Sequence, residues 1–104
     1  MQDIHSLAAR QLAPGVTGHY VHGENLTFGY VHLKQGSRVP LHSHPQEQST
    51  YLVSGQLDMQ IGDARYSLTP GMVHVIPANT LHDAYAVVDT EVIDTFSPAR
   101  EDYR

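Results

Sequence analysis

Short runs of alternating apolar and polar residues extend through most of this 104-residue chain and restrict the folds open to it. In an extended strand, successive side chains point to opposite faces, so a period of two buries one face and exposes the other. Glycine, proline, asparagine or aspartate separates almost all of the runs. Many short strands punctuated in this way predict an all-β fold, an antiparallel sandwich or barrel. The runs cover residues 16–21, 26–33, 51–53, 57–61, 66–68, 73–76, 84–88 and 91–96.

Turn and helix signals refine this prediction. Gly55, and Gly62 with Asp63, follow apolar runs where a hairpin turn needs residues that tolerate a positive φ. Pro77 should end a strand, where its missing N–H does least harm. Only residues 4–12 have a pattern typical of a helix, which is too short to organise a fold. We expect one domain over residues 1–104, because a chain of this length has room for one core.

The composition excludes several classes of function. Without cysteine there can be no disulfide, thiolate metal site or cysteine nucleophile. The formal net charge is -5 and Lys34 is the only lysine, whereas nucleic-acid and anionic-membrane partners both require clustered cations. The N-terminal residues do not have the pattern of a signal peptide, and no apolar run could span a bilayer. The expected location is therefore the cytoplasm.

Histidines give the strongest indication of chemistry. His42 and His44 are separated by one residue, so in an extended segment they project from the same face, and Gln48 has the same parity. His82, far along the chain, offers a further ligand. Three imidazoles and one oxygen suit a divalent transition metal such as Ni, Zn, Fe, Mn or Co. The remaining histidines are expected on the surface or in packing: His5, His19, His22, His32 and His74.

The spacing of these residues resembles the two sequence motifs of the cupins. The first motif is a glycine, five residues, His-x-His, three or four residues, a glutamate, six residues and a glycine. The second combines a glycine, a proline and a histidine. The resemblance implies a double-stranded β-helix, or jelly roll, with a divalent metal in its interior held by His42, His44, Gln48 and His82. The residues that match the motifs are Gly36, His42, His44, Gln48 and Gly55, followed by Gly71, Pro77 and His82.

Two positions depart from the cupin motifs. Asn79 replaces a glycine, a mild change because asparagine tolerates the left-handed conformation. Gln48 replaces the glutamate, which keeps an oxygen ligand but removes its charge, so a bound ion would be a stronger Lewis acid. Glu47 is the alternative ligand if the loop shifts by one residue, although the spacing to Gly55 favours Gln48. A barrel that has lost its metal is the other alternative, and it leaves three buried imidazoles unpaired.

The C-terminal residues carry a more specific pattern. Residues 94–98 are Asp-Thr-Phe-Ser-Pro and residues 100–102 are Arg-Glu-Asp. This pattern resembles the end of the chain in a smaller group of cupins, the KdgF-type pectin degradation proteins. The resemblance implies ring opening of 4,5-unsaturated uronate monosaccharides, the products of pectin or alginate lyases, to linear keto-uronates. It also implies that Asp94 is the catalytic acid/base and that Phe96 and Arg100 line the substrate pocket.

Residue chemistry is consistent with these roles. Asp94 and Phe96 share a face at period two, and a carboxylate near a divalent ion in an apolar pocket is placed for proton transfer. Arg100 offers a planar bidentate clamp for the carboxylate of a small anionic sugar. In the alternative interpretation, Asp94 is bound by a backbone amide, Phe96 is core, and Arg100 is a solvated partner of Glu101 or Asp102.

Two other classes of function remain open from the sequence. One is a different metal-dependent cupin enzyme, such as a small dioxygenase, and the other is a non-catalytic cupin that binds a sugar or a metal. Small cupins commonly pair through exposed sheet edges, so the resemblance also implies a homodimer. Residues 16–33 are expected to supply much of its contact.

Overall fold

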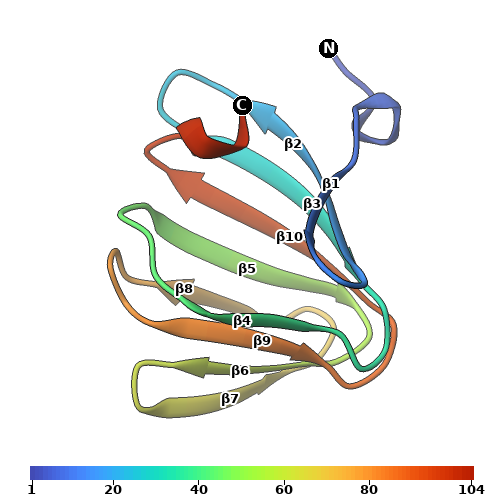
Figure 1. Cartoon of the computed structure of the whole chain (residues 1–104), viewed down its shortest axis with the longest axis vertical. Coiled ribbons are helices and arrows are strands. Elements are labelled where there is room, and N and C mark those ends of the chain that lie inside the picture. The colour runs from blue at the N-terminus through green and yellow to red at the C-terminus, as the bar shows by residue number, and fades with distance from the viewer.

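The computed structural model describes residues 1–104 and confirms the predicted all-β fold, with ten strands and two 3-10 turns (Figure 1). The strands form two antiparallel sheets. One has six strands in the order β1-β2-β3-β10-β5-β8, and the other has four in the order β4-β9-β6-β7. The elements are η1 (Ile4–Ser6), β1 (Arg10–Ala13), β2 (Val16–His22), β3 (Thr27–Leu33), β4 (Arg38–His42), β5 (Glu47–Ser54), β6 (Leu57–Ile61), β7 (Ala64–Leu68), β8 (Val73–Ile76), β9 (His82–Ala86), β10 (Thr90–Ser97) and η2 (Glu101–Tyr103).

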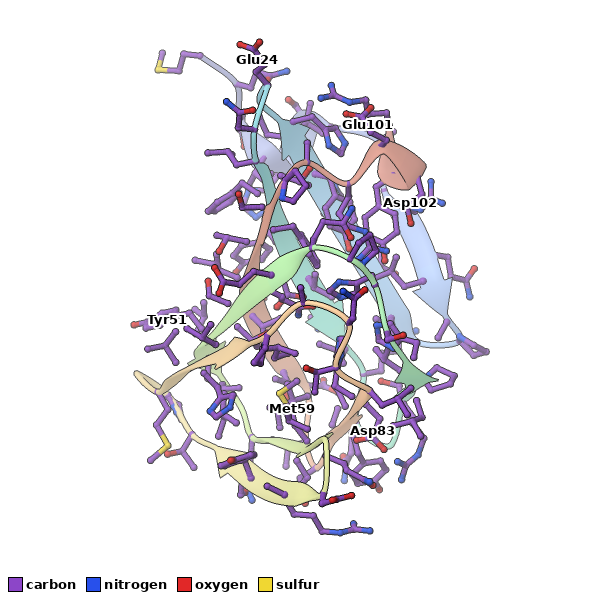
Figure 2. All side chains as sticks on the ribbon, turned by 90° about the vertical axis from the view of Figure 1, so that its left-hand side faces the viewer. Glu24, Tyr51, Met59, Asp83, Glu101 and Asp102 are labelled. Carbon is purple, nitrogen blue, oxygen red and sulfur yellow. The ribbon has the colours of Figure 1, made fainter.

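The hydrophobic core lies between the two sheets. Along β3 every second residue is buried, from Thr27 to Leu33, as the alternating pattern predicts. Figure 2 shows Met59 of β6 lying inside, whereas Tyr51 of β5 points outward and is exposed. Each fully buried aliphatic side chain contributes about 1.5–3 kcal/mol to stability. The core residues are Val16, Val31, Leu33, Leu52, Leu57, Met59, Ile61, Leu68, Ile76, Ala84, Ala86 and Val92.

The chain crosses repeatedly between the sheets, and these crossings place the motif residues. Strand β4 of the small sheet ends at His42, and β5 of the large sheet begins at Glu47. Strand β8 of the large sheet is followed by β9 of the small sheet, which begins at His82. His42 and His82 are register partners in the β4–β9 pair. Residues 43–46 and 77–81 therefore cross at the same end of the two sheets.

The helical pattern of residues 4–12 is realised only as a short N-terminal turn, the 3-10 turn Ile4–Ser6, and its extension to residue 12 is wrong. Arg10–Ala13 is strand β1, which pairs with β2 in the register Arg10 to Gly18 and Ala13 to Val16. Pairing satisfies the backbone groups at the free edge of β2, which outweighs a weak local helix preference. The sequence pattern also missed β4, an edge strand with mostly exposed residues that accommodates Pro40.

The turn predictions are mostly confirmed. Gly62 and Asp63 connect β6 to β7 as a two-residue hairpin, and Pro77 directly follows β8. Asn79 has a φ of 61°, the left-handed conformation for which its side chain is suited. Gly55 does have a positive φ of 94°, but the predicted hairpin there is wrong. Strands β5 and β6 belong to different sheets, so this turn carries the chain from one sheet to the other.

Strands β1 and β8 are the edges of the six-stranded sheet, and β4 and β7 are the edges of the other. Residues 16–33 form β2 and β3, which lie in the interior of their sheet. They therefore offer no free edge for the expected dimer contact, because β1 already pairs with β2. The homodimer itself stays a prediction. No helix of the structure is long and apolar enough to cross a membrane.

Two glycines with nearly the same backbone conformation test how much the Gly55 crossing contributes to stability. Gly55 and Gly71 have φ values of 94° and 92°. A Cβ on Gly55 would lie 2.4 Å from the carbonyl oxygen of Asp89, whereas a Cβ on Gly71 meets nothing within 4 Å. Both alanine variants pay for the left-handed backbone, about 1–2 kcal/mol. We expect Gly55→Ala to lose at least about 2 kcal/mol more than Gly71→Ala in urea unfolding, because the backbone must also shift. Equal losses would contradict this account.

Candidate metal centre and adjoining pocket

Three histidines from separate parts of the chain lie together at the crossing end of the sheets. His42 and His82 face each other across β4 and β9, with ring centroids 4.2 Å apart. The ring of His44 lies 4.9 Å from that of His82 and 5.6 Å from that of His42. One nitrogen from each ring lies within 4.8 Å of the others. His44 belongs to the loop after β4, so the loop rather than strand alternation turns its ring inward.

A backbone carbonyl fixes the tautomer of each imidazole. Every Nδ1 of the three rings lies within hydrogen-bond distance of a carbonyl oxygen two residues away, and a carbonyl only accepts, so Nδ1 carries the proton. In its neutral form each ring therefore presents its Nε2 lone pair to the other two. Burial lowers the pKa of His82 to about 4, and burial also lowers the pKa of His44, which keeps both neutral at pH 7. The acceptors are Pro40, Gln46 and Thr80, at 2.8, 3.0 and 2.8 Å from His42, His44 and His82 respectively.

Gln48 offers a fourth possible metal ligand beside the three histidines. It is 6% exposed at the start of β5, whereas Glu47 is exposed on the opposite face, so the structure favours Gln48 over Glu47 as the residue beside the histidines. Gln48 Nε2 donates to Thr50 Oγ1 at 3.0 Å, which turns Oε1 toward His44 Nε2 at 2.9 Å. With Nδ1 protonated, those two atoms are both acceptors and repel each other.

The residues present fit a divalent metal ion. The Nε2 atom of His82 is buried and has no hydrogen-bond partner. A cation among the three Nε2 atoms and the Gln48 oxygen would satisfy this nitrogen and remove the repulsion between His44 and Gln48. Three imidazoles and one neutral oxygen form a donor set typical of Zn, Ni, Fe, Mn or Co sites.

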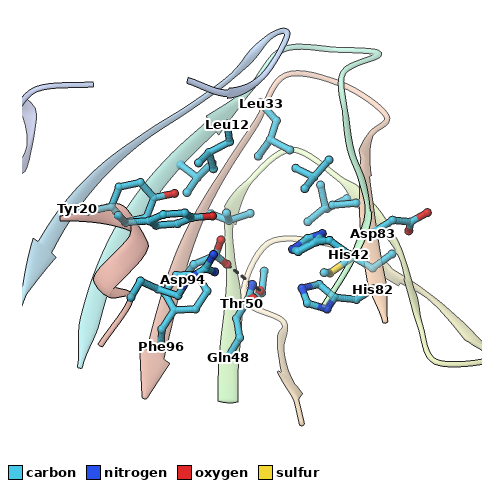
Figure 3. A pocket seen from close by; sticks show the side chains of 18 residues that line it. Leu12, Tyr20, Leu33, His42, Gln48, Thr50, His82, Asp83, Asp94 and Phe96 are labelled. Atoms are coloured by element: carbon cyan, nitrogen blue, oxygen red, sulfur yellow. Dashed lines mark hydrogen bonds between the residues drawn. The ribbon is translucent and has the colours of Figure 1, made fainter. Parts of the chain in front are cut away.

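A hydrogen-bonded chain connects this centre to Asp94. Thr50 of β5 and Asp94 of β10 are register partners, and Thr50 Oγ1 donates to Asp94 Oδ1 at 2.7 Å (Figure 3). Gln48 donates in turn to Thr50, so two bonds separate the amide of Gln48 from the carboxylate. Burial raises the pKa of Asp94 to about 6, and the hydrogen bond from Thr50, the nearby Gln48 amide and the charge of Arg100 limit the rise. Asp94 is thus a carboxyl group poised for proton transfer near neutral pH.

Phe96 and Arg100 line the same pocket as Asp94, His42 and His82. The Arg100 guanidinium lies 4.9 Å from the centre of the Phe96 ring and 3.9 Å from that of Tyr103. Its Nε and Nη2 donate to both carboxylate oxygens of Asp102, at 3.0 and 2.9 Å. This pairing was the alternative expected from the sequence, but Arg100 is only 5% exposed and is not solvated. Its Nη1 group makes no hydrogen bond within the protein.

The pocket residues that the sequence analysis missed include Thr50, Tyr20 and Tyr103. Thr50 could have been found, because it has the same strand parity as Gln48. Tyr20 lies in β2, far from either motif, and only the sheet pairing brings it to Asp94. The other five histidines lie outside the cluster, and two of them bind locally, His19 to the Leu7 carbonyl and His22 to Thr27.

Comparison with known proteins identifies the family. Residues 29–95 match the family model described as the cupin domain. The chain is a cupin. No curated protein matches its sequence. Among solved structures it is similar to KdgF from a Halomonas species, with a TM-score of 0.89 and 30% identity over 96% of this chain and 94% of that one. This cupin is therefore KdgF-like in sequence as well as in fold.

Other solved structures share the fold of this cupin. An RmlC-like cupin from Shewanella frigidimarina matches with a TM-score of 0.93 and 24% identity, over 100% of this chain and 95% of that one. An oxalate decarboxylase variant from Bacillus subtilis matches 91% of this chain and 28% of its own length, with a TM-score of 0.84 and 20% identity. Cupins with different activities thus share this architecture, so activity must be argued from the site.

Metal binding can be measured without any substrate. After dialysis against a chelator, addition of Zn, Ni, Co or Mn ions should raise the melting temperature. At an ion concentration of 100 times the dissociation constant, the free energy of unfolding should rise by about 2.7 kcal/mol. His42→Ala removes one ligand and should lose at least half of that shift. His74→Ala, on β8 outside the cluster, is the matched control and should keep it. A full shift in His42→Ala, or no shift with any ion, would contradict the assignment.

The raised pKa of Asp94 has a consequence for stability. A carboxyl group whose pKa rises from 3.8 to about 6 on folding binds its proton more tightly in the folded state, so its ionisation destabilises the fold as pH rises through that window. Asp94→Asn keeps an acceptor for Thr50 and removes the charge. In metal-free protein at about pH 7.5 it should raise the free energy of unfolding by roughly 1–3 kcal/mol.

The gain should shrink by more than half near pH 4, where the folded protein holds Asp94 protonated. Urea unfolding at both pH values provides the measurement. Asp58→Asn is the control, because Asp58 lies on exposed β6 surface and accepts a bond from Ser67, so it should give no such gain. A gain that is absent at neutral pH, or equal at both pH values, would show that Asp94 is not destabilised by burial.

Proposed function

We propose that this cupin opens the ring of 4,5-unsaturated uronate monosaccharides, the products of pectin or alginate lyases, to give linear keto-uronates. The observation that carries the proposal is the pocket that Asp94 shares with His42, His82 and Gln48 of the metal-type cluster. A proton-transfer group with a pKa of about 6 lies beside a metal-type donor set, and a buried cation, Arg100, lines the same cavity. The 30% identity to KdgF supports the same conclusion.

Ring opening of such a sugar needs one proton to move from oxygen to carbon. Asp94 accepts the proton of the hydroxyl on C1, the bond between C1 and the ring oxygen breaks, and C1 becomes an aldehyde. The electron pair of that bond remains on the ring oxygen, which becomes the oxygen of an enol(ate) at C5. Asp94 then returns the proton to C4, and the C5 oxygen becomes a ketone. The reaction is an isomerisation, so a single carboxyl group that alternates between base and acid suffices.

Each proposed site residue has one task in this reaction. His42, His44, Gln48 and His82 hold the divalent ion, which would supply a Lewis acid that binds substrate oxygens and stabilises negative charge on them. Thr50 holds the Asp94 carboxylate in place through its 2.7 Å bond.

Arg100 and Phe96 form the substrate-binding side of the pocket. The free Nη1 of Arg100 is available to the uronate carboxylate, which a protein of formal net charge -5 must attract locally. The Phe96 ring packs against the Arg100 guanidinium, whose Cζ atom lies 4.9 Å from the ring centre, and shields the guanidinium from water. The small anionic sugar and the homodimer stay proposals.

Turnover can be followed as loss of the conjugated enol-ether absorbance of an unsaturated uronate. The metal-loaded protein should accelerate this loss over the spontaneous reaction without consuming oxygen. Asp94→Asn should reduce kcat by about 10²- to 10⁴-fold, the usual contribution of a general acid or base. Asp58→Asn, on the exposed face of β6, should retain the activity of the parent.

The outcomes separate this proposal from its rivals. No acceleration by the parent protein would defeat it, and so would a fully active Asp94→Asn. Turnover coupled to oxygen consumption would indicate a dioxygenase instead. Retained sugar binding without turnover in the parent would indicate a cupin that binds a sugar and does no chemistry on it.

A further inference from the structure

The hydroxyl of Tyr20 is a buried polar group for which the protein provides no partner. Tyr20 lies in β2, and its Oη atom is buried in the free protein and makes no hydrogen bond. Nearly all buried polar groups in proteins are paired, because an unpaired one loses its bonds to water without compensation. The tyrosine also lines the pocket that contains Asp94. A group of this kind needs an explanation in terms of what enters the pocket.

Two glycines provide the space in which the Tyr20 ring lies. A Cβ on Gly29 would be 2.5 Å from Cε1 of the ring, and a Cβ on Gly18 would be 2.5 Å from Oη. Neither glycine has a positive φ, so the backbone does not require glycine at these positions. The missing side chains let the ring lie flat on the sheet, an arrangement found where an aromatic residue covers a glycine on the neighbouring strand.

Sheet register places Tyr20 in the same row as Asp94. Gly29 of β3 is the register partner of Tyr20 on one side and of Asp94 on the other, and Asp94 is the partner of Thr50. The four residues form one row across β2, β3, β10 and β5. Because Gly29 has no side chain, the Tyr20 ring and the Asp94 carboxylate are neighbours on the pocket face. Figure 3 shows them on one side of the pocket, with His42 and His82 on the other.

Tyr20 is held as a neutral donor. Burial and then the charge of Asp94 raise the pKa of Tyr20 far above the usual range, so the hydroxyl keeps its proton under all ordinary conditions. No hydrogen bond joins Tyr20 to Asp94, whose Oδ1 already accepts from Thr50. The phenol can therefore offer its proton to an acceptor on a bound molecule.

We propose that Tyr20 Oη donates a hydrogen bond to the ring oxygen of the substrate, on which negative charge develops as the ring opens. This inference rests on the proposed function. The hydroxyl oxygen deprotonated by Asp94 and the ring oxygen are both bonded to C1, so a substrate whose C1 hydroxyl meets Asp94 brings its ring oxygen to the side of the pocket that Tyr20 lines. Tyr20 keeps its proton throughout, and Asp94 alone carries the transferred proton from oxygen to C4. A donor aimed at developing charge in a water-poor site lowers the barrier.

Packing alone does not account for the hydroxyl. The Tyr20 ring contacts the Tyr103 ring at 4.9 Å between centroids, and a phenylalanine ring would make the same contact. Tyr20→Phe removes an unpaired polar atom and should leave the melting temperature unchanged or raise it. A residue with a purely structural role would then show full activity. A residue that donates to the substrate in the transition state shows a loss of kcat without a loss of stability.

The test compares Tyr20→Phe with Tyr30→Phe in the metal-loaded protein. Tyr20→Phe should lower kcat by about 10- to 100-fold and change KM by less than about threefold, because the bond forms chiefly with charge that develops after binding. The Tyr30 hydroxyl, by contrast, already has a partner, Glu91 on the neighbouring strand. Tyr30→Phe should therefore keep the parent kcat and lower the melting temperature.

Each outcome bears on the inference separately from the proposed function. An active parent with an equally active Tyr20→Phe overturns the inference alone. An unchanged kcat with a raised KM would show that the hydroxyl bonds an oxygen of the bound substrate, such as its carboxylate, as strongly before the reaction as during it. That result also overturns the inference. A Tyr20→Phe that fails to unfold cooperatively shows a structural role and overturns it as well. An inactive parent defeats the proposed function, and the inference with it.

Discussion

The register of β10 between β3 and β5 is the constraint on which the rest of the pocket depends. It sets Asp94 beside Thr50 on one strand and beside Gly29 on the other, and it sets Phe96 opposite Gln48. Because side chains alternate between faces, a slip of one residue would turn Asp94 and Phe96 to solvent and bring their neighbours into the core. The buried Val92 on the same strand opposes such a slip, since it would lose its place between the sheets.

Short-range hydrogen bonds fix the tautomer and the orientation of the three histidines. Each imidazole is held by a carbonyl two residues away, so its orientation depends on local backbone conformation and not on distant packing. The left-handed Asn79 contributes here, because its N–H donates to the His44 carbonyl and ties the two crossing segments together. Precise ligand orientation of this kind is what a metal site requires of its surroundings.

Several polar groups in the pocket destabilise the fold. It contains a partly buried carboxyl group with a raised pKa, a phenol without a partner and an imidazole nitrogen without a partner. Each of these groups lowers stability in the free protein, and each would be satisfied by a cation or by an oxygen-rich ligand. Their concentration in one cavity, while the core elsewhere is aliphatic, is the physical argument that this cavity is a functional site.

The sequence alone predicted the all-β class and most of the strands, because alternation is a local property that survives folding. It also implied, through its resemblance to the cupin motifs, the convergence of His42, His44, Gln48 and His82, although His44 is turned inward by its loop and not by the strand alternation expected of it. It misread residues 4–12 as helical and missed β4, since an edge strand is defined by what it pairs with. It could not relate Tyr20 to Asp94 either, because their proximity depends on the pairing of β2, β3 and β10 and on the space left by Gly29. Contacts between residues far apart in the chain are set by register and packing, and only the tertiary structure decides those.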